Sequence, residues 1–239
     1  HLVSAPVSNA LSNVFLDIYL KSFNESDSVW TYIVPVNHPL VPGEGFSAWS
    51  SSSTTGNTIV GYKGFLNNGD LPLQLDYTAP ATHGGKGWNL VGNPFPSAIA
   101  WQNTWNQVNV DYTVYVFDGV QYLTWNHNNG GTGFGTKGNG DIPVGQGFWV
   151  KANNTGAALK LPQSERKHSS QDFYKNTMYL QDAIQLHVSG NGFDDNTIVW
   201  FNPGATEGFD PEWDAYKLKG ISAAPQLYSI IPGFLLSVN

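Results

Sequence analysis

The chain has 239 residues, enough for one large β domain or two smaller ones with a substantial core. Charged residues make up only 12% of it, the formal net charge is -7, and no cluster of Lys and Arg occurs. A phosphate backbone or an anionic membrane surface requires such a cluster, so we predict no nucleic-acid partner. The longest apolar run, at 228–236, contains Pro232 and Gly233 and is too short for membrane insertion.

The polar character of the chain comes largely from uncharged residues. Aromatic residues reach 14%, with 9 Trp and 11 Tyr, and Asn, Ser, Thr and Gly are abundant. Rings, amides and hydroxyls suit uncharged polar partners such as glycans, although plain extracellular β-proteins share this composition. Cysteine is absent, which excludes a disulfide framework and a thiolate metal site.

Short runs rich in Val, Ile, Tyr, Phe and Trp, bounded by Gly, Pro and Asn, predict strands along the whole chain. In chain order the predicted strands are 14–20, 29–35, 45–49, 58–65, 71–77, 88–91, 112–117, 121–125, 147–151, 158–161, 183–189, 197–202, 227–231 and 234–238. Near 97–102 the pattern also allows short helical turns, because Trp101 and Trp105 are four residues apart. Turn dipeptides such as Asn191-Gly192 separate the strands. This pattern predicts an all-β fold with an antiparallel β-sandwich or barrel architecture.

An internal repeat is the most informative pattern. Residues 1–8 align with 89–96, and residues 42–46 align with 144–148, with an aromatic strand, a turn and a second aromatic strand between the anchors in both copies. The distance in residues between aligned positions is larger at the second anchor than at the first. The second copy therefore has extra residues, which we place in its Gly/Asn-rich stretch 126–140. We therefore predict a tandem duplication of one β unit.

The repeat divides the chain into three predicted units. These are a first β repeat at 1–87, a second β repeat at 88–165, and a further β segment at 166–239. A polar stretch at 163–171 predicts a linker before the last unit. The segment 234–239 ends within a strand pattern, so we expect the last unit to be truncated and further domains of the same polypeptide to be partners.

Several stretches resemble a region near the C-terminus of secreted Bacteroidetes proteins, upstream of the type IX secretion sorting domain. The stretches are GWNLVGNPFPSAI at 87–99, IPVGQGFWV at 142–150, ATEGFD at 205–210 and DAYKL at 214–218. The resemblance implies a secreted or cell-surface location and an accessory role beside varied enzymes, adhesins and repeat proteins. It implies no activity of its own.

Catalytic motifs are absent from the sequence. It contains no Gly-x-Ser-x-Gly elbow, no His-Glu-x-x-His helix and no phosphate-binding loop, and the six His show no paired metal spacing. Glycosidase chemistry needs two carboxylates across a cleft. Candidates are Asp17, Glu44, Asp118 and Asp141. Glu44 aligns with Gln146 of the second copy, which argues against a duplicated catalytic pair, so we predict that the chain is not an enzyme.

An acidic cluster marks the last segment. Six acidic residues fall within 194–214, a stretch that contains no Lys or Arg. Loop carboxylates can bind Ca²⁺, and the candidate metal ligands are Asp194, Asp195, Asp210 and Asp214. No known calcium-loop spacing is present, and the alternative is solvated turns held by structural hydrogen bonds. No other cofactor is predicted.

Aromatic side chains are the remaining binding candidates, because flat rings of Trp and Tyr can stack against the apolar face of a sugar. The predicted ligand-binding residues lie around the loops of the second copy: Trp101, Trp105, Tyr122, Trp125, Asn126 and Asn128. We expect Trp101, Trp105 and Trp125 to be exposed. Trp49 and Trp149 follow the Gly-x-Gly-Phe anchors, and we expect them to alternate into a core.

The sequence therefore predicts a non-catalytic extracellular accessory module that binds a polysaccharide or surface glycan through exposed aromatic residues. One alternative is a structural or adhesive spacer domain of a cell-surface protein. A second alternative is a polysaccharide-active enzyme with an unrecognised site. Exposed aromatic residues on one face would favour glycan binding, and burial of the aromatic residues would favour the spacer.

Overall fold

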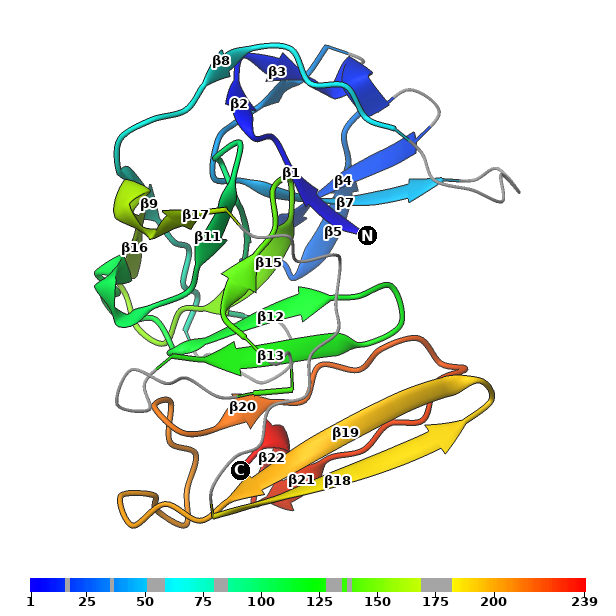
Figure 1. Cartoon of the computed structure of the whole chain (residues 1–239), viewed down its shortest axis with the longest axis vertical. Helices are drawn as coiled ribbons and strands as arrows, with labels where there is room; N and C mark the ends of the chain where they lie inside the picture. The colour runs from blue at the N-terminus through cyan, green and yellow to red at the C-terminus, as the bar shows by residue number, and fades with distance from the viewer. Residues whose placement is uncertain are drawn as a thin grey trace.

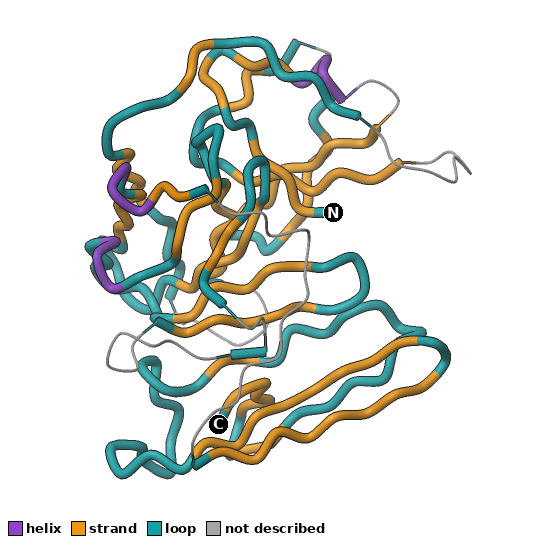
Figure 2. Tube along the Cα trace, viewed as in Figure 1, coloured by secondary structure: helices purple, strands orange, loops and turns teal. Residues whose placement is uncertain are grey.

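The computed structural model describes residues 1–15, 18–34, 37–50, 59–79, 86–127, 135–136, 139–168 and 182–239. Within these ranges the regular structure is β, apart from three short 3₁₀ turns, η1 (Ser12–Phe15), η2 (Asn103–Trp105) and η3 (Gln163–Glu165), as Figure 2 shows. Almost every strand pairing is antiparallel. The predicted all-β fold is confirmed.

Two four-stranded sheets carry the duplication. The first contains β1 (Leu2–Ser4), β7 (Gly45–Ser50), β4 (Ile18–Asn24) and β5 (Val29–Tyr32), in that spatial order. The second contains β10 (Trp88–Gly92), β15 (Gly147–Lys151), β12 (Thr113–Phe117) and β13 (Tyr122–Asn126), again in that order. The same strand order, reached by the same path along the chain, confirms the internal duplication predicted from the anchors.

The two sheets also share their registers. Lys21 of β4 lies opposite Ser47 of β7, and Tyr115 of β12 lies opposite Trp149 of β15. Since Ser47 and Trp149 each stand two residues after the glycine that begins its strand, Lys21 and Tyr115 occupy equivalent positions.

Reciprocal hydrogen bonds join the repeats. The Ser4 amide donates to the Gly145 carbonyl at 2.8 Å, and the Gly92 amide donates to the Gly43 carbonyl at 2.9 Å. Ser4 and Gly92 are equivalent positions of the two repeats, as are Gly43 and Gly145. The same contact is therefore made twice, each time from the first strand of one repeat to the loop before the last strand of the other.

Smaller sheets complete the repeats. The pairs and triplet are β2 (Val7–Ser8) with β8 (Phe65–Leu66), β3 (Ala10–Leu11) with β6 (Pro39–Leu40), β9 (Leu71–Gln74) with β16 (Ala158–Leu161), and β11 (Ala98–Ala100) between β14 (Asp141–Ile142) and β17 (Arg166–Lys167). Because β9 pairs with β16, the predicted units at 1–87 and 88–165 share a sheet. Their exact boundaries stay predictions.

Several local predictions are wrong. The stretch 97–102, where the sequence pattern allows a helical turn, contains strand β11, and the 3₁₀ turn η2 follows directly after it. In the predicted strand 58–65, the residues at 59–64 are not paired, and the strand β8 begins at Phe65. Residues 163–167 of the predicted linker form η3 and β17, which docks on β11. In each case a strand pairing with a distant part of the chain determines the local structure. Such a pairing cannot be inferred from a short stretch of sequence.

The C-terminal segment forms a third sheet. It contains β18 (Ala183–Gly190), β19 (Phe193–Trp200), β22 (Phe234–Val238) and β20 (Ala215–Tyr216) in that order, with β21 (Ser229–Ile231) paired to β22. Asn191 and Gly192 both have positive φ, at 56° and 78°, as a tight β-hairpin turn requires. Figure 1 shows this sheet lying against β12 and β13, at the end of the molecule away from β2 and β3.

Three apolar clusters stabilise the molecule. One lies within the first repeat around Phe46 and Leu40, and one lies within the second repeat around Trp101 and Phe148. The third joins both repeats to the C-terminal sheet, where Trp88, Tyr115 and Trp149 pack with Ile198 and Val238, among others. The C-terminal segment is thus attached by core packing to the outer face of the second sheet.

Candidate functional site

The tryptophans predicted to bind a ligand are buried. Trp101 and Trp105 have no exposed surface, and Trp125 is 5% exposed. The Trp101 indole donates to the Tyr112 carbonyl at 2.8 Å, and the Trp105 indole donates to the Ala100 carbonyl at 2.7 Å. The prediction that these side chains are exposed is wrong. The segment after β11 folds inward, and its two rings fill the core of the second repeat together with Trp125 of β13.

Tyr122 and Asn126, the other predicted ligand residues that the structure describes, do not form an exposed surface either. Tyr122 is half-buried and packs on Phe117. Asn126 is 1% exposed, and its Nδ2 donates to Thr113 Oγ1 at 3.0 Å. Asn128 lies outside the described residues. The second repeat therefore uses these side chains for packing and internal hydrogen bonds.

A different set of aromatic residues is exposed on the first repeat. Trp49 is 62% exposed, Tyr32 is 51% exposed and Tyr19 is 46% exposed. They alternate along β7, β5 and β4 so that all three side chains leave the same face of the first sheet. We call this surface, with Lys21 and Val34, the aromatic face. The prediction that Trp49 enters a core is wrong, whereas Trp149 is buried as expected.

The rings of the aromatic face contact one another. Tyr19 and Trp49 are cross-strand partners, with 5.7 Å between ring centroids and 28° between ring planes. Tyr32 meets Tyr19 edge-on, with centroids 6.0 Å apart. Lys21 Nζ lies 4.3 Å from the centroid of the Tyr32 ring. Strand pairing and mutual ring contacts therefore hold these side chains in place without a ligand.

The aromatic face is continuous with a buried aromatic cluster. On the same side of the sheet, Phe23 and Trp30 pack on Trp149 of the second repeat, with centroid distances of 4.8 Å and 5.6 Å. The first sheet is thus covered at one end by the second repeat and open at the other. Trp49 is exposed because the second repeat does not extend over this end of the first sheet. The local sequence pattern gives no information about that boundary.

In the second repeat the equivalent face is closed by the C-terminal segment. The Tyr216 amide donates to the Tyr115 hydroxyl at 3.0 Å, and Tyr216 packs edge-on against Trp88. Thr113, which is equivalent to Tyr19, is fully buried. Two faces of common origin therefore differ: one holds a segment of this chain, and the other exposes aromatic rings to solvent.

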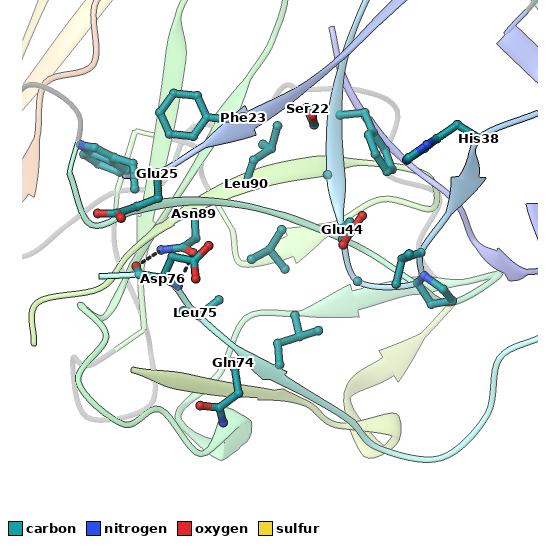
Figure 3. Close-up of a pocket in the computed structure, with 18 residues that line it drawn as sticks. Ser22, Phe23, Glu25, His38, Glu44, Gln74, Leu75, Asp76, Asn89 and Leu90 are labelled. Atoms are coloured by element: carbon teal, nitrogen blue, oxygen red, sulfur yellow. Dashed lines mark hydrogen bonds between the residues drawn. The ribbon is translucent and has the colours of Figure 1, made fainter. Parts of the chain in front are cut away.

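A pocket of about 400 Å³ lies between the repeats (Figure 3). Its walls come from β4, from the loop leading into β7, from β9 with the residues after it, and from β10. Glu25 stands at one end, and Glu44 with His38 stands at the other. Asp76 also lines it, and its lining contains no Lys or Arg. Apart from His38, the titratable side chains that line the pocket are therefore carboxylates, and they stand among apolar residues such as Leu73 and Leu90.

The carboxylates of this pocket differ in their bonding. Glu25 accepts hydrogen bonds from the Gly87 amide and from both the amide and the hydroxyl of Thr78. Burial by itself raises the pKa of Glu25, but these hydrogen bonds outweigh it and hold the pKa below its ordinary value. Partial desolvation of the carboxyl group in the pocket raises the pKa of Glu44, although its side chain keeps solvent contact, and the nearby His38 opposes this effect. Glu25 therefore fixes the segment between the two repeats through Thr78 and Gly87, whereas the Glu44 carboxyl group faces the pocket.

The other acids considered for glycosidase chemistry lie elsewhere. Asp118 accepts the amides of Val120 and Gln121 at 2.8 Å in the turn between β12 and β13. Asp141 pairs with Lys167 at 2.6 Å. Asp17 lies outside the described residues. The structure therefore does not bring Glu44 together with Asp118 or Asp141.

The acidic cluster predicted as a calcium site is distributed over two places. Asp195 is buried, and both of its carboxylate oxygens accept from Lys217 Nζ, at 2.7 Å and 2.5 Å. Asp194 is exposed at the end of the β18–β19 hairpin, where it accepts from Ser189 Oγ. Asp195 is thus neutralised by an internal cation, which leaves it no free oxygen for a metal ion.

Asp210 and Asp214 lie together in the turn before β20. Asp210 accepts from the amide and hydroxyl of Thr206, and Asp214 accepts from the Asp210 amide at 2.8 Å. Burial, with a contribution from the Asp210 charge, raises the pKa of Asp214 to about 6. Within the described part of the chain, no three His, Asp or Glu residues are arranged to hold a metal ion. Calcium binding stays a prediction.

Comparisons with known proteins place the chain in one family. Residues 3–238 match the sequence profile described as "Domain of unknown function (DUF8693)". No curated protein and no solved structure matches the chain. Among the described residues, no helix is long and apolar enough to cross a membrane.

Proposed function

The chain belongs to the DUF8693 family, and we propose that it is a non-catalytic extracellular accessory module that binds a polysaccharide or surface glycan through the aromatic face. The observation that carries this proposal is the exposed pair of Tyr19 and Trp49, side by side on adjacent strands. The ligand-binding role predicted for the second repeat is assigned to the first repeat instead.

The chemistry of the face suits a sugar ring. Stacking an aromatic side chain on the apolar C–H face of a pyranose is favourable, because it removes a large apolar area of both the ring and the sugar from water. Tyr19 and Tyr32 add hydroxyl groups that can donate to and accept from sugar hydroxyls. Since β4, β5 and β7 already fix the rings, binding loses little side-chain entropy.

The stability of the folded protein does not explain why the Trp49 and Tyr19 rings are exposed. Trp49 and Tyr19 are among the largest apolar side chains, and burying them would stabilise the protein. Equivalent positions of the second repeat are covered. A ligand that covers the face intermittently accounts for both observations. The extracellular location is part of the proposal and accords with the resemblance to secreted accessory regions.

The test is a binding screen against insoluble plant, algal and host polysaccharides, followed by pull-down with the best one. Trp49→Ala should lose at least about fivefold in affinity, since ring stacking commonly contributes more than about 1 kcal/mol. The matched control is Phe201→Ala, which removes an exposed ring (60% exposed) from the C-terminal segment and should bind normally. Repeating the pull-down in EDTA tests the calcium prediction.

Two results would contradict the proposal. One is the absence of binding across all glycan classes, which would favour a spacer domain. The other is equal loss of binding in Trp49→Ala and Phe201→Ala, which would place the ligand elsewhere.

A further inference from the structure

We infer that the glycan bound by the aromatic face is anionic, and that Lys21 binds its carboxylate or sulfate group. The inference rests on the proposed function and names the class of its ligand. Lys21 is the one charged side chain among the residues that define the face.

Lys21 is central to the exposed rings. It lies on β4 two residues after Tyr19 and pairs across strands with Tyr32 on one side and Ser47 on the other. Its ammonium group lies 4.3 Å from the Tyr32 centroid. This cation–π contact positions the charge beside the exposed rings, where a sugar stacked on them would present its substituents.

Among the residues that the structure describes, no ion pair neutralises the charge of Lys21. Strands β4, β5 and β7 contain no Asp or Glu. In the described parts of the chain, the lysines that form ion pairs are Lys160, Lys167 and Lys217, each with an aspartate. In a protein of net charge -7, a cation among aromatic rings with no acid on its strands is a local feature that favours an anion.

The second repeat shows which residue occupies the position equivalent to Lys21. At the equivalent position the second repeat has Tyr115, which is fully buried beneath the C-terminal segment and bonded to the Tyr216 amide. An ammonium group at that position would lose its hydration. The second repeat does bury a lysine elsewhere on this face, Lys151, but its ammonium group donates to the Lys86 carbonyl. The first repeat keeps its face open and carries a charge at the Lys21 position, which suits a charged partner.

The test compares polysaccharides that differ only or mainly in charge. Polygalacturonate and its fully methyl-esterified form test a carboxylate, and κ-carrageenan and agarose test a sulfate. Affinity electrophoresis measures wild type, Lys21→Gln and the control Lys219→Gln, which removes an exposed lysine from the C-terminal segment. Trp49→Ala is measured on the same gels.

We expect wild type and Lys219→Gln to prefer one anionic polysaccharide over its neutral counterpart by about two- to fivefold, as one solvent-exposed ion pair allows. Lys21→Gln should bind both members equally. Raising NaCl from about 20 mM to about 500 mM should remove the preference while leaving the neutral affinity intact.

The two proposals fail in distinguishable ways. Equal binding of charged and neutral members by wild type, with both lost in Trp49→Ala, would overturn the anionic ligand and keep the aromatic face. A preference that persists in Lys21→Gln would overturn the role of Lys21. Binding to no member of either pair, nor to any glycan of the wider screen, would overturn both proposals.

Discussion

Glu44 and Gln146 hold equivalent positions in the two repeats, yet one side chain is exposed and the other is buried. Each forms an antiparallel bridge to the other repeat, Gln146 to Val3 and Glu44 to Val91. Gln146 is 1% exposed and its amide donates to the Leu2 carbonyl at 2.9 Å. A carboxylate cannot donate such a bond, so Glu44 turns toward the pocket of Figure 3.

Exchanging the two residues should therefore have opposite effects. Glu44→Gln can donate to carbonyls of the opposite repeat and should stabilise the protein by about 0.5–1.5 kcal/mol. Gln146→Glu places a charge against the Leu2 and Gly147 carbonyls and should destabilise it by about 3 kcal/mol. Urea unfolding measures both. Equal effects of the same sign would contradict the equivalence of the two junctions.

Tryptophans of the core and of the aromatic face should differ in their contribution to stability. Trp101→Ala removes a fully buried ring and its hydrogen bond to Tyr112, and should cost about 3–5 kcal/mol. Trp49→Ala should change the free energy of unfolding by less than about 1 kcal/mol. Thermal unfolding followed by circular dichroism compares them. A large loss in Trp49→Ala would show that this ring is structural.

The buried ion pair of the C-terminal segment should be strongly coupled. Lys217→Met leaves the Asp195 carboxylate buried without its cation and should cost about 3–5 kcal/mol. Adding Asp195→Leu removes the stranded charge and should recover most of the loss. Denaturant unfolding of both single variants and the double variant gives the coupling energy. Additive losses would contradict a direct interaction.

Asp111 should make stability depend on pH. Its Oδ1 accepts from Asn153, but its buried Oδ2 has no hydrogen-bond partner among the described residues, and burial raises the pKa of Asp111 to about 6. Because the folded pKa exceeds the unfolded one, ionisation favours unfolding, and stability is lost as pH rises from about 4 to about 6.

Comparing wild type with Asp111→Asn isolates this contribution. The variant has no carboxyl group at this position, so wild type should lose about 2–3 kcal/mol relative to it between about pH 4 and pH 8. Urea midpoints across this range measure the difference. A constant difference between the two proteins would show that the pKa of Asp111 is not raised.

The duplication could be predicted from sequence because its anchors mark close contacts of the backbone. A Cβ on Gly45 would lie 2.6 Å from the Val91 carbonyl oxygen, and a Cβ on Gly147 would lie 2.9 Å from the Val3 carbonyl oxygen. Only glycine fits at both junctions. The need for glycine at equivalent positions keeps the Gly-x-Gly-Phe string visible in both copies.

Exposure of the aromatic residues could not be predicted in the same way. Trp49 and Trp149 each lie on a strand that begins with a Gly-x-Gly-Phe anchor, and their spacing from that anchor places both on the same face of equivalent strands. Trp149 is buried because Phe23 and Trp30 of the other repeat reach it. Alternation with a charged residue is not a sufficient signal either, because Lys151 alternates with Trp149 on β15 and is buried.

The most direct test of the central claim is an indole ¹H–¹⁵N spectrum titrated with an oligosaccharide of the glycan selected by pull-down. Trp49→Phe and Trp101→Phe identify the two signals. We predict that the Trp49 signal shifts in a saturable way, while the signals of the buried Trp101 and Trp105 stay in place. Saturable shifts of other indoles with the Trp49 signal unchanged would contradict binding at the aromatic face.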